Sequence, residues 1–388
     1  MNKGKTLFAQ LMGFVPRKVL EECVLRYKGD YASKGFSCRD QFLAMAFAQL
    51  THTGSLRGLV AALTFNRSCL YHMGFNCRLV SRNTLAWANE HRPWRIYADF
   101  ATVMMARARE LYRQEPLGRD FDAEVFAVDS TTIDLCLTRF PWAKFRRTKS
   151  GIKAHTVFDV RRNLPEFIVI SSAKVNDVNF LDELDYSPGA YYVFDRGYVD
   201  FARLKTINDS QAFFVTRMKR RTKFGVVESR RVDRSTGLKV DQEILLKNPL
   251  SRERYPSHLR RVKFFDVETN RRLVFLTNEM TLPGEMIAQF YKLRWRIELF
   301  FKWVKQHLEI ERFYGYSENA VLTQFWIGVS VFCLLAIARK ELLGDNELHE
   351  IQEIFRTSVF QKIPIIQAFS KVECEKIKTD SCNPMGLF

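Results

Sequence analysis

Apolar residues in the first 112 positions recur at intervals of three or four, which is the spacing of one face of an amphipathic helix. The clearest stretches are Arg39–Leu50, Ser55–Leu63 and Ser81–Trp94. Ser55 and Ser81 stand where a serine hydroxyl can cap the first turn of a helix. The pattern predicts a helical N-terminal domain over residues 1–112. Short helices joined by tight turns suit a DNA-binding module and a plain scaffold equally well, so the role of this domain stays open.

After a predicted linker at residues 114–122, which contains Pro116 and Gly118, the apolar period becomes that of strands. The predicted order is three strands, a helix, a strand, a helix and a strand, with residues 161–165 joining the second and third strands as a hairpin. This order predicts an α/β fold, a mixed sheet with the hairpin on one side and helical crossovers on the other. The predicted strands are 124–129, 154–160, 166–172, 190–195 and 212–217. One predicted helix begins at about residue 176, and the other spans 200–207.

A second group of short apolar runs lies between residues 213 and 282, where the helical period is absent. Four runs (226–227, 244–246, 262–267 and 272–276), with turns at 235–237 and 269–270, predict a β-rich insertion. From Gly284 to about Phe369 the pattern is helical again. Ala320–Ala338 has no charged residue and approaches membrane-spanning length, but Thr323 and Gln324 within it favour a helix buried in a protein core.

Composition narrows the choice of partner. The chain has 60 Lys and Arg against 43 Asp and Glu, a net charge of +17, and its hydrophobic content of 47% is that of a folded globular protein. Such an excess favours a polyanion, most commonly nucleic acid, although a membrane surface or an acidic protein would satisfy the same charge. The eight cysteines include no C-x-x-C pair, and the N-terminus is a poor signal peptide. We therefore expect reduced thiols, no zinc site, no membrane span and a cytoplasmic location.

Two aspartates follow buried strands. Asp129 closes the apolar run 125–128, and Asp195 closes the run 191–194. In sheets with crossover helices, ligand sites collect at the carboxyl ends of the strands. Either aspartate alone is equally well explained as a turn former or helix cap, but two at the ends of different strands favour a functional site.

The third acidic candidate belongs to a helical segment. Tyr291, Arg294, Glu298 and Lys305 lie at offsets 0, 3, 7 and 14, which places them within an arc of about 60° on one helix face. A solvated face with an Arg294–Glu298 ion pair is the alternative explanation. The apolar stripe on the other side consists of Leu293, Ile297, Phe300, Val304 and Leu308.

These four residues and their spacings resemble the Tyr-(2)-Arg-(3)-Glu-(6)-Lys signature of a large family of bacterial insertion-sequence transposases of the Asp-Asp-Glu type, the IS-four-like family. The resemblance covers roughly residues 123–345. It implies a ribonuclease-H-like fold, a β-rich insertion between the second Asp and the Glu, and a catalytic, metal-binding triad of Asp129, Asp195 and Glu298.

Two divalent cations about 4 Å apart can activate the attacking oxygen and stabilise the leaving oxygen of a phosphodiester, and such ions prefer oxygen ligands. The resemblance implies two Mg²⁺, or Mn²⁺ in their place, with Asp129 bridging both and Asp195 and Glu298 each holding one.

The same resemblance implies DNA contacts around the triad. Arg294 and Lys305 would contact phosphates beside the scissile bond, and Tyr291 would hydrogen-bond or pack against the DNA end. Trp295 would stack on a base drawn out of the duplex, or is a core tryptophan.

Basic runs without interleaved acids support a DNA substrate. His155, beside the first run, is explained by a DNA contact or as an ordinary strand histidine, and the acidic residues at 177–185 by capping and solvation. The runs are Arg146, Arg147, Lys149 and Lys153, and then Arg217, Lys219, Arg220, Arg221 and Lys223.

We therefore expect a DNA transposase that binds double-stranded DNA, both the inverted-repeat ends of its element and the target, and that cleaves and joins strands. The resemblance also implies a homodimer on DNA. The alternatives are a two-metal structure-selective nuclease and a non-catalytic DNA-binding descendant of a transposase. The predicted domains are 1–112 (helical), 123–212 with 283–345 (catalytic), 213–282 (insertion) and 346–388 (C-terminal helical tail).

Overall fold

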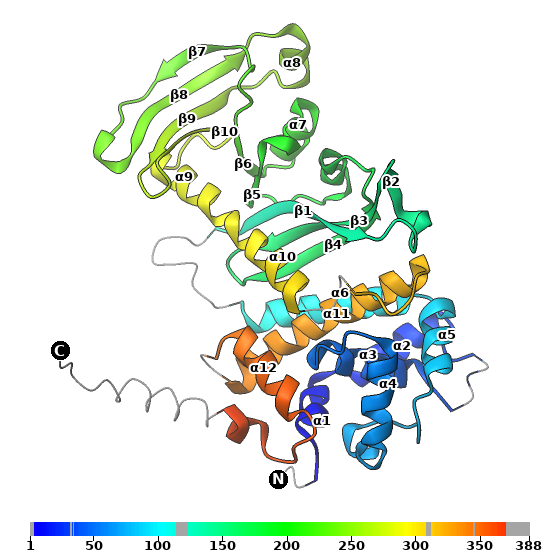
Figure 1. Cartoon of the computed structure of the whole chain (residues 1–388). Coiled ribbons are helices and arrows are strands. Elements are labelled where there is room, and N and C mark those ends of the chain that lie inside the picture. The colour runs from blue at the N-terminus through cyan, green and yellow to red at the C-terminus, as the bar shows by residue number, and fades with distance from the viewer. Residues whose placement is uncertain are drawn as a thin grey trace, which may run out of the picture. The chain divides into compact units, whose positions relative to one another are not determined.

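The computed structural model describes residues 4–31, 33, 35–113, 123–307, 312–343 and 346–369. The predicted linker at 114–122, Leu308 of the apolar stripe and the tail beyond 369 lie outside the described residues. The chain forms two compact units (Figure 1). The first comprises 1–113, 138–142 and 302–388, and the second comprises 114–137 and 143–301. Residues 302–345, which we predicted to belong to the catalytic domain, thus group with the N-terminal helices.

The first unit is helical, as its sequence predicts. Ser55 accepts a hydrogen bond from the Gly58 amide and Ser81 one from the Thr84 amide, so both serines cap helices. The helix predicted to reach Trp94 ends at His91, because Pro93 follows and forces Arg92 into an extended conformation. The helices are α1 (Leu7–Leu11), α2 (Arg17–Arg26), α3 (Cys38–Leu50), α4 (Leu56–Phe65), α5 (Arg82–His91), α6 (Arg95–Leu111), α11 (Glu318–Ala338) and α12 (Leu348–Ser358), with 3₁₀ turns at Met12–Phe14, Arg67–Cys69 and Tyr71–Met73 and a π turn at Arg339–Leu343.

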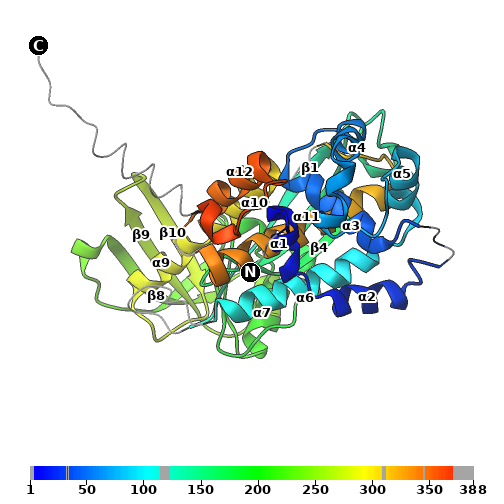
Figure 2. The same cartoon turned by 90° about the horizontal axis from the view of Figure 1, so that it is seen from below.

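Helix α11 is the core of this unit. Every residue from Ala320 to Ala338 is buried, and α3, α5 and α6 pack against the helix; Figure 2 shows α6 and α11 side by side. Among the described residues, Glu318–Leu342 is the one helix that is long and apolar enough to cross a membrane, and its apolar window is fully buried inside the structure. The prediction of a core helix is confirmed.

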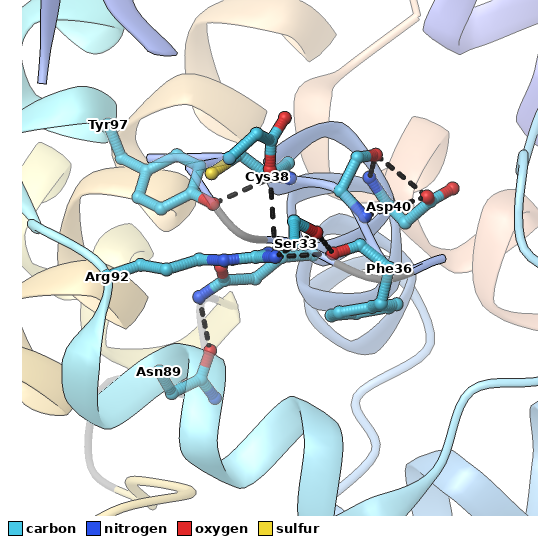
Figure 3. Close-up of polar contacts among 10 residues, drawn as sticks. Ser33, Phe36, Cys38, Asp40, Asn89, Arg92 and Tyr97 are labelled. Carbon is cyan, nitrogen blue, oxygen red and sulfur yellow. Dashed lines mark hydrogen bonds and ion pairs between the residues drawn. The ribbon is translucent and has the colours of Figure 1, made fainter. Parts of the chain in front are cut away.

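A buried arginine connects α3 to α5. Arg92 donates hydrogen bonds to the Phe36 carbonyl, to the Ser33 hydroxyl (3.2 Å) and to Gln41 Oε1 (3.1 Å) (Figure 3). Gln41 in turn donates to Asn89 on α5 at 2.9 Å. Because each buried polar group has a partner, the charge of Arg92 can be accommodated in the interior.

The second unit contains the mixed sheet. β1 pairs in parallel with β5, and β5 with β6, while β1–β3 and β3–β4 are antiparallel. The predicted hairpin and strand order are therefore confirmed. A short strand before the hairpin was not predicted. The strands are β1 (Val125–Leu135), β2 (Lys144–Arg146), β3 (Lys149–Asp159), β4 (Leu164–Ser172), β5 (Tyr191–Phe194) and β6 (Phe213–Arg217).

Two predictions within this sheet need correction. β1 does not end at Asp129 but continues to Leu135, because β3 pairs with it over ten residues while β5 pairs only with its first four. The helix expected from residue 176 is a 3₁₀ helix, η5 (Asp177–Glu183), capped by Asn176. The next helix, α7 (Phe201–Asp209), begins after Asp200, as predicted.

The insertion extends the same sheet. All four predicted strands are present, as β7 (Phe224–Ser229), β8 (Leu238–Leu246), β9 (Leu259–Asp266) and β10 (Arg271–Thr277). β10 pairs with β6, so the order across the sheet continues β6–β10–β9–β8–β7. We expected no helix in this segment, but it contains a short one, α8 (Pro249–Arg254). Asn248 caps this helix, and Pro249 stands in its first turn.

Two helices follow the insertion and lie across the strands (Figure 1), where we predicted a single one. α9 (Gly284–Leu293) and α10 (Trp295–His307) meet at Arg294. There the backbone hydrogen bonds run over three residues, from the Arg294 amide to Tyr291 and from the Ile297 amide to Arg294, so the turn is tighter than an α-helix. α10 is held on the sheet by a hydrogen bond from Arg296 to the Val160 carbonyl and by packing of Phe300 on Phe158.

A buried ion pair connects the insertion to the start of α9. Arg260 donates to both carboxylate oxygens of Asp241, at 2.8 and 2.6 Å, and to the Leu282 carbonyl at 2.6 Å. Both side chains are buried. The pair therefore fixes the chain immediately before Pro283, where α9 begins.

Removing one member of this pair should cost far more than removing an exposed partner. Arg260→Met leaves a buried, unpaired carboxylate and should lower the free energy of unfolding by about 3–5 kcal/mol. The double variant Arg260→Met/Asp241→Leu should recover most of that loss. Urea unfolding measures both, with Lys205→Met, which breaks the exposed Lys205–Asp209 pair, as control. Equal losses for Arg260→Met and the control would show that the Arg260–Asp241 pair contributes no more than an exposed ion pair.

Candidate active site

Strand register brings the two aspartates together. Val128 of β1 and Phe194 of β5 are the last paired residues of two parallel neighbours. Asp129 and Asp195 each come one residue later, so they lie side by side where the pairing of β1 with β5 ends. Asp195 accepts a hydrogen bond from the Gly197 amide at 2.5 Å, and its carbonyl accepts one from Thr216 on β6 at 3.1 Å.

Arg294 joins Glu298 to this pair. One of its terminal nitrogens lies 3.1 Å from Asp129 Oδ2, and the other donates to Glu298 Oε1. Asp129 and Arg294 are 165 positions apart in the chain, so the contact depends on the tertiary fold. The i, i+4 ion pair that we considered as an alternative is present, but it is not merely a solvated face, because the same guanidinium contacts Asp129.

The environment of Asp129 disfavours its charge. Burial raises the pKa of the Asp129 carboxyl to about 6, and the negative charges of Asp195 and Glu298 add to the rise. A hydrogen bond from the Ser130 amide (2.8 Å) and the charge of Arg294 act in the opposite direction without cancelling it. The charge of Arg294 therefore compensates for burial and for the neighbouring carboxylates only in part.

The donor set fits a hard divalent cation. The three side chains offer only carboxylate oxygens, which Mg²⁺ and Mn²⁺ prefer, and a bound cation would offset the raised pKa of Asp129. In the part of the chain that the structure describes, no three acidic, His or Cys side chains are already close enough to hold an ion. Arg294 supplies the positive charge between Asp129 and Glu298.

The other residues of the predicted helical face lie on α9 and α10. Tyr291 is half-buried, with its ring 4.9 Å from that of Phe275 and the Arg294 guanidinium over its face. Lys305 lies two turns after Glu298 on α10 and is half-buried. Trp295 is 57% exposed at the start of α10, so the core-tryptophan alternative is wrong.

The predicted basic residues differ in exposure. Arg146 and Arg147, in and directly after β2, are exposed, as are Arg220 and Arg221 in the turn before β7. Lys153 is not on the surface. Its ammonium donates to the Val175 carbonyl at 2.8 Å and lies 2.9 Å from Asp177, and only 11% of the side chain is exposed.

His155 is an interior strand histidine. Its side chain is 2% exposed, stacks on Phe180 and shares a hydrogen bond with the Ser171 hydroxyl at 2.8 Å. Burial lowers the pKa of its imidazole to about 4, with Lys153 acting in the same direction and Asp177 against it. The structure therefore favours the ordinary strand histidine over the DNA contact.

Sequence reasoning missed the role of Asp177. We attributed this residue to capping and solvation, but Asn176 is the cap, and Asp177 accepts a 2.6 Å hydrogen bond from Ser130, the residue that follows Asp129. Burial would raise the pKa of Asp177, but the hydrogen bonds from Ser130 and Lys153 outweigh it and hold that pKa below its usual value. A serine directly after a candidate aspartate was the only signal in the sequence.

The strand order of the mixed sheet is that of a ribonuclease-H-like fold. Residues 120–334, more than half of the chain, match the family described as the transposase DDE domain, and the chain belongs to this family. The predicted membership is confirmed, and with it the activity class, a DDE transposase of the insertion-sequence type. Such enzymes generally use divalent metal ions. Residues 3–76 match a family described only as a domain of unknown function.

Three relatives named as transposases agree with this membership. The protein y4zB of Sinorhizobium fredii is 34% identical over 264 residues, 66% of this chain and 71% of its own length. The protein of insertion sequence element IS5377 from Geobacillus stearothermophilus is 29% identical over 58% of this chain and 59% of its own. That of element IS4SA from Synechocystis is 25% identical over 81% and 84%. Among solved structures, a synaptic complex of piggyBac transposase with hairpin DNA aligns with 98% of this chain and 84% of its own, at a TM-score of 0.46 and 10% identity.

The buried His155 should make the stability of the protein depend on pH. Its folded-state pKa of about 4 lies below the value of 6.5 for an unperturbed histidine, so between these values the unfolded chain binds a proton that the folded protein does not. Stability should therefore fall as the pH drops from 7 to 4.5, by on the order of 2–3 kcal/mol from this group. His155→Gln should remove that part of the slope in urea unfolding. If the dependence of stability on pH is the same in His155→Gln as in the parent, His155 is not its source.

Proposed function

We propose that this transposase binds the terminal inverted repeats of an insertion sequence, cleaves a strand at each end and transfers the resulting 3′ hydroxyl to another phosphodiester. The observation that carries the proposal is that Arg294 contacts both Asp129 and Glu298, while Asp195 follows the strand that pairs in parallel with the strand of Asp129. This set matches the chemistry of phosphodiester cleavage, because the substrate, the attacking water and the leaving oxygen all develop negative charge that needs nearby cations.

Two Mg²⁺ ions, or Mn²⁺, are the proposed cofactors. Asp129 would contact both, and Asp195 and Glu298 would each hold one. When bound, the metals would lower the pKa of the attacking water and stabilise the leaving oxygen.

Arg294 has two proposed roles. Without metal it offsets the charge of Asp129 and Glu298. When cations replace it there, its guanidinium becomes available for a phosphate oxygen beside the scissile bond. Lys305 on the same helix would contact a neighbouring phosphate. Tyr291 would pack against the DNA end, and the exposed ring of Trp295 would stack on an unpaired base.

Exposed arginines outline the proposed path of the DNA. In the second unit these are Arg146, Arg147, Arg220 and Arg221. In the first unit, the segment from α4 to α5 favours DNA contact over a plain scaffold, because it carries four exposed arginines and the exposed ring of Trp87, and Glu90 is the one acidic residue between positions 53 and 95. The four are Arg57, Arg67, Arg78 and Arg82.

A homodimer that holds two ends is proposed from the family resemblance. A cytoplasmic location is proposed from the cysteine pattern and the poor signal peptide. A structure-selective nuclease would use the same carboxylates but would release products without joining them. A strand-transfer assay with a labelled terminal-repeat duplex and plasmid target separates the two functions, since only a transposase joins the label to the plasmid.

Substitution of the three carboxylates tests the site. Asp129→Asn, Asp195→Asn and Glu298→Gln should each reduce Mg²⁺-dependent cleavage of a terminal-repeat duplex by at least about a hundredfold, because electrostatic stabilisation is typically the largest catalytic contribution. Binding of the duplex without metal should be retained. Asp134→Asn removes an exposed carboxylate from the same strand and should cleave like the parent. Parent-like rates in all three variants would exclude this site.

Substitution of the exposed arginines tests the path of the DNA. Arg220→Gln/Arg221→Gln should weaken duplex binding at every sequence, and the slope of log affinity against log salt should fall by about one for each phosphate that the variant no longer neutralises. Fluorescence anisotropy at several salt concentrations measures this. Lys205→Gln, whose charge is paired with Asp209, is the control. A slope equal to that of the parent would place the DNA elsewhere.

A further inference from the structure

A chain of polar contacts lies on the face of β1 opposite to Asp129. Successive residues of a strand point to opposite faces, so Ser130 is directed away from the side on which Arg294 contacts Asp129. Its hydroxyl donates to Asp177 Oδ1 at 2.6 Å, and the Lys153 ammonium lies 2.9 Å from the same oxygen. Lys153 also donates to the Val175 carbonyl, two residues before Asp177. Three segments, β1, β3 and the start of η5, are thus connected through one carboxylate oxygen.

This contact set differs from an ordinary surface ion pair. The Lys153 side chain is 11% exposed and that of Asp177 39%. An ion pair between exposed side chains contributes little. Lys153 instead contacts both the Val175 carbonyl and Asp177, and these contacts restrict the positions of the pair and of the Ser130 hydroxyl that Asp177 binds.

Ser130 also contacts Asp129 directly. Its backbone amide donates to Asp129 Oδ1 at 2.8 Å, while the other oxygen, Oδ2, faces Arg294. The same residue is thus bound by Asp177 through its side chain and to Asp129 through its backbone. The orientation of the Ser130 peptide determines which oxygen of Asp129 is directed into the site.

The strand needs such a support at this position. The parallel pairing of β1 with β5 ends at Val128, so from Asp129 onward β1 has a paired neighbour, β3, on one edge only. An unpaired strand edge is freer to shift than the interior of a sheet. The hydrogen bond from Ser130 to η5 supplies a restraint at the residue next to the metal-binding candidate, where pairing with β5 no longer does.

We propose that Asp177, together with Lys153, is a positioning residue of the active site, which holds Ser130 so that Asp129 presents Oδ2 to the catalytic cations. The inference rests on the proposed function of Asp129. It assigns Asp177 no contact with substrate or metal. Its effect should therefore appear in the affinity for metal and leave the affinity for DNA unchanged.

The test measures metal binding by the full-length protein as well as catalysis. Asp177→Ala should raise the Mn²⁺ dissociation constant, followed by electron paramagnetic resonance of free Mn²⁺, by about 10- to 100-fold, the usual cost of losing a residue that orients a metal ligand. The Mg²⁺ concentration for half-maximal cleavage should rise by a similar factor, and metal-free binding of the terminal-repeat duplex should stay at the parent value.

Asp182→Asn is the matched control, because Asp182 also lies in η5 and forms an ion pair, with Arg203, but has no link to β1. Thermal unfolding of each variant separates a loss of stability from a loss of positioning. Should Asp177→Ala fail to fold, Ser130→Ala removes only the hydroxyl, and it should shift the Mn²⁺ dissociation constant in the same direction, whereas Ser130→Thr, which keeps a hydroxyl, should restore it.

The inference and the proposed function fail in different ways. If Asp129→Asn abolishes Mn²⁺ binding while Asp177→Ala and Ser130→Ala bind it as the parent does, the positioning role is refuted and the site stands. If Asp129→Asn itself binds Mn²⁺ like the parent, the proposed metal site is refuted, and the positioning role with it. Equal shifts in Asp177→Ala and Asp182→Asn would also overturn the inference, since η5 would then act only through stability.

Discussion

The negative charges of Asp195 and Glu298 both act on Asp129, so the fold must hold these carboxylates near one another in spite of their repulsion. In this structure the guanidinium of Arg294 stands between Asp129 and Glu298, and it offsets part of their charge. The compensation is incomplete, because burial keeps the pKa of Asp129 near 6. Hard divalent cations bind where negative charge is not fully compensated and where the ligands are oxygen atoms, and these carboxylates provide both. In the proposed function, bound cations would offset the same negative charge that Arg294 offsets here.

The rest of the second unit can be understood as the support of this arrangement. Parallel pairing of β1 with β5 sets Asp129 and Asp195 side by side. The insertion continues the sheet from β6 through β10, and Arg260 connects it to Leu282, two residues before α9. Arg296 and Phe300 then hold α10 against the end of β3, and Glu298 on that helix contacts Arg294. Each of these contacts joins segments that are far apart in the sequence, and each constrains where one carboxylate can lie.

Much of this was predictable from the sequence where local patterns determine structure. The mixed sheet, its hairpin and the four strands of the insertion follow from apolar periodicity, and the helix caps at Ser55 and Ser81 follow from their side chains. The candidate triad needed the signature spacing as well, because an acidic residue after a strand is not specific by itself.

What the sequence could not provide depends on tertiary contacts. The extension of β1 past Asp129 is set by its pairing with β3, and the break at Arg294 by a tighter turn between two helices. The burial of Lys153 and the link from Ser130 to Asp177 arise from packing of η5 on the sheet, so that a lysine in a basic run became an interior partner. The exposure of Trp295 likewise excludes a core tryptophan, and no local sequence pattern determines that exposure.

The central claim is that cations take over the charge compensation that Arg294 provides in their absence. A crystal structure of the full-length protein with a terminal-repeat duplex and Mn²⁺, with anomalous scattering recorded for manganese, tests it most directly. The account predicts anomalous peaks within coordination distance of Asp129, Asp195 and Glu298, with the Arg294 guanidinium moved from Asp129 to a phosphate. Manganese bound elsewhere, or Arg294 still between the two carboxylates in the loaded complex, would contradict it.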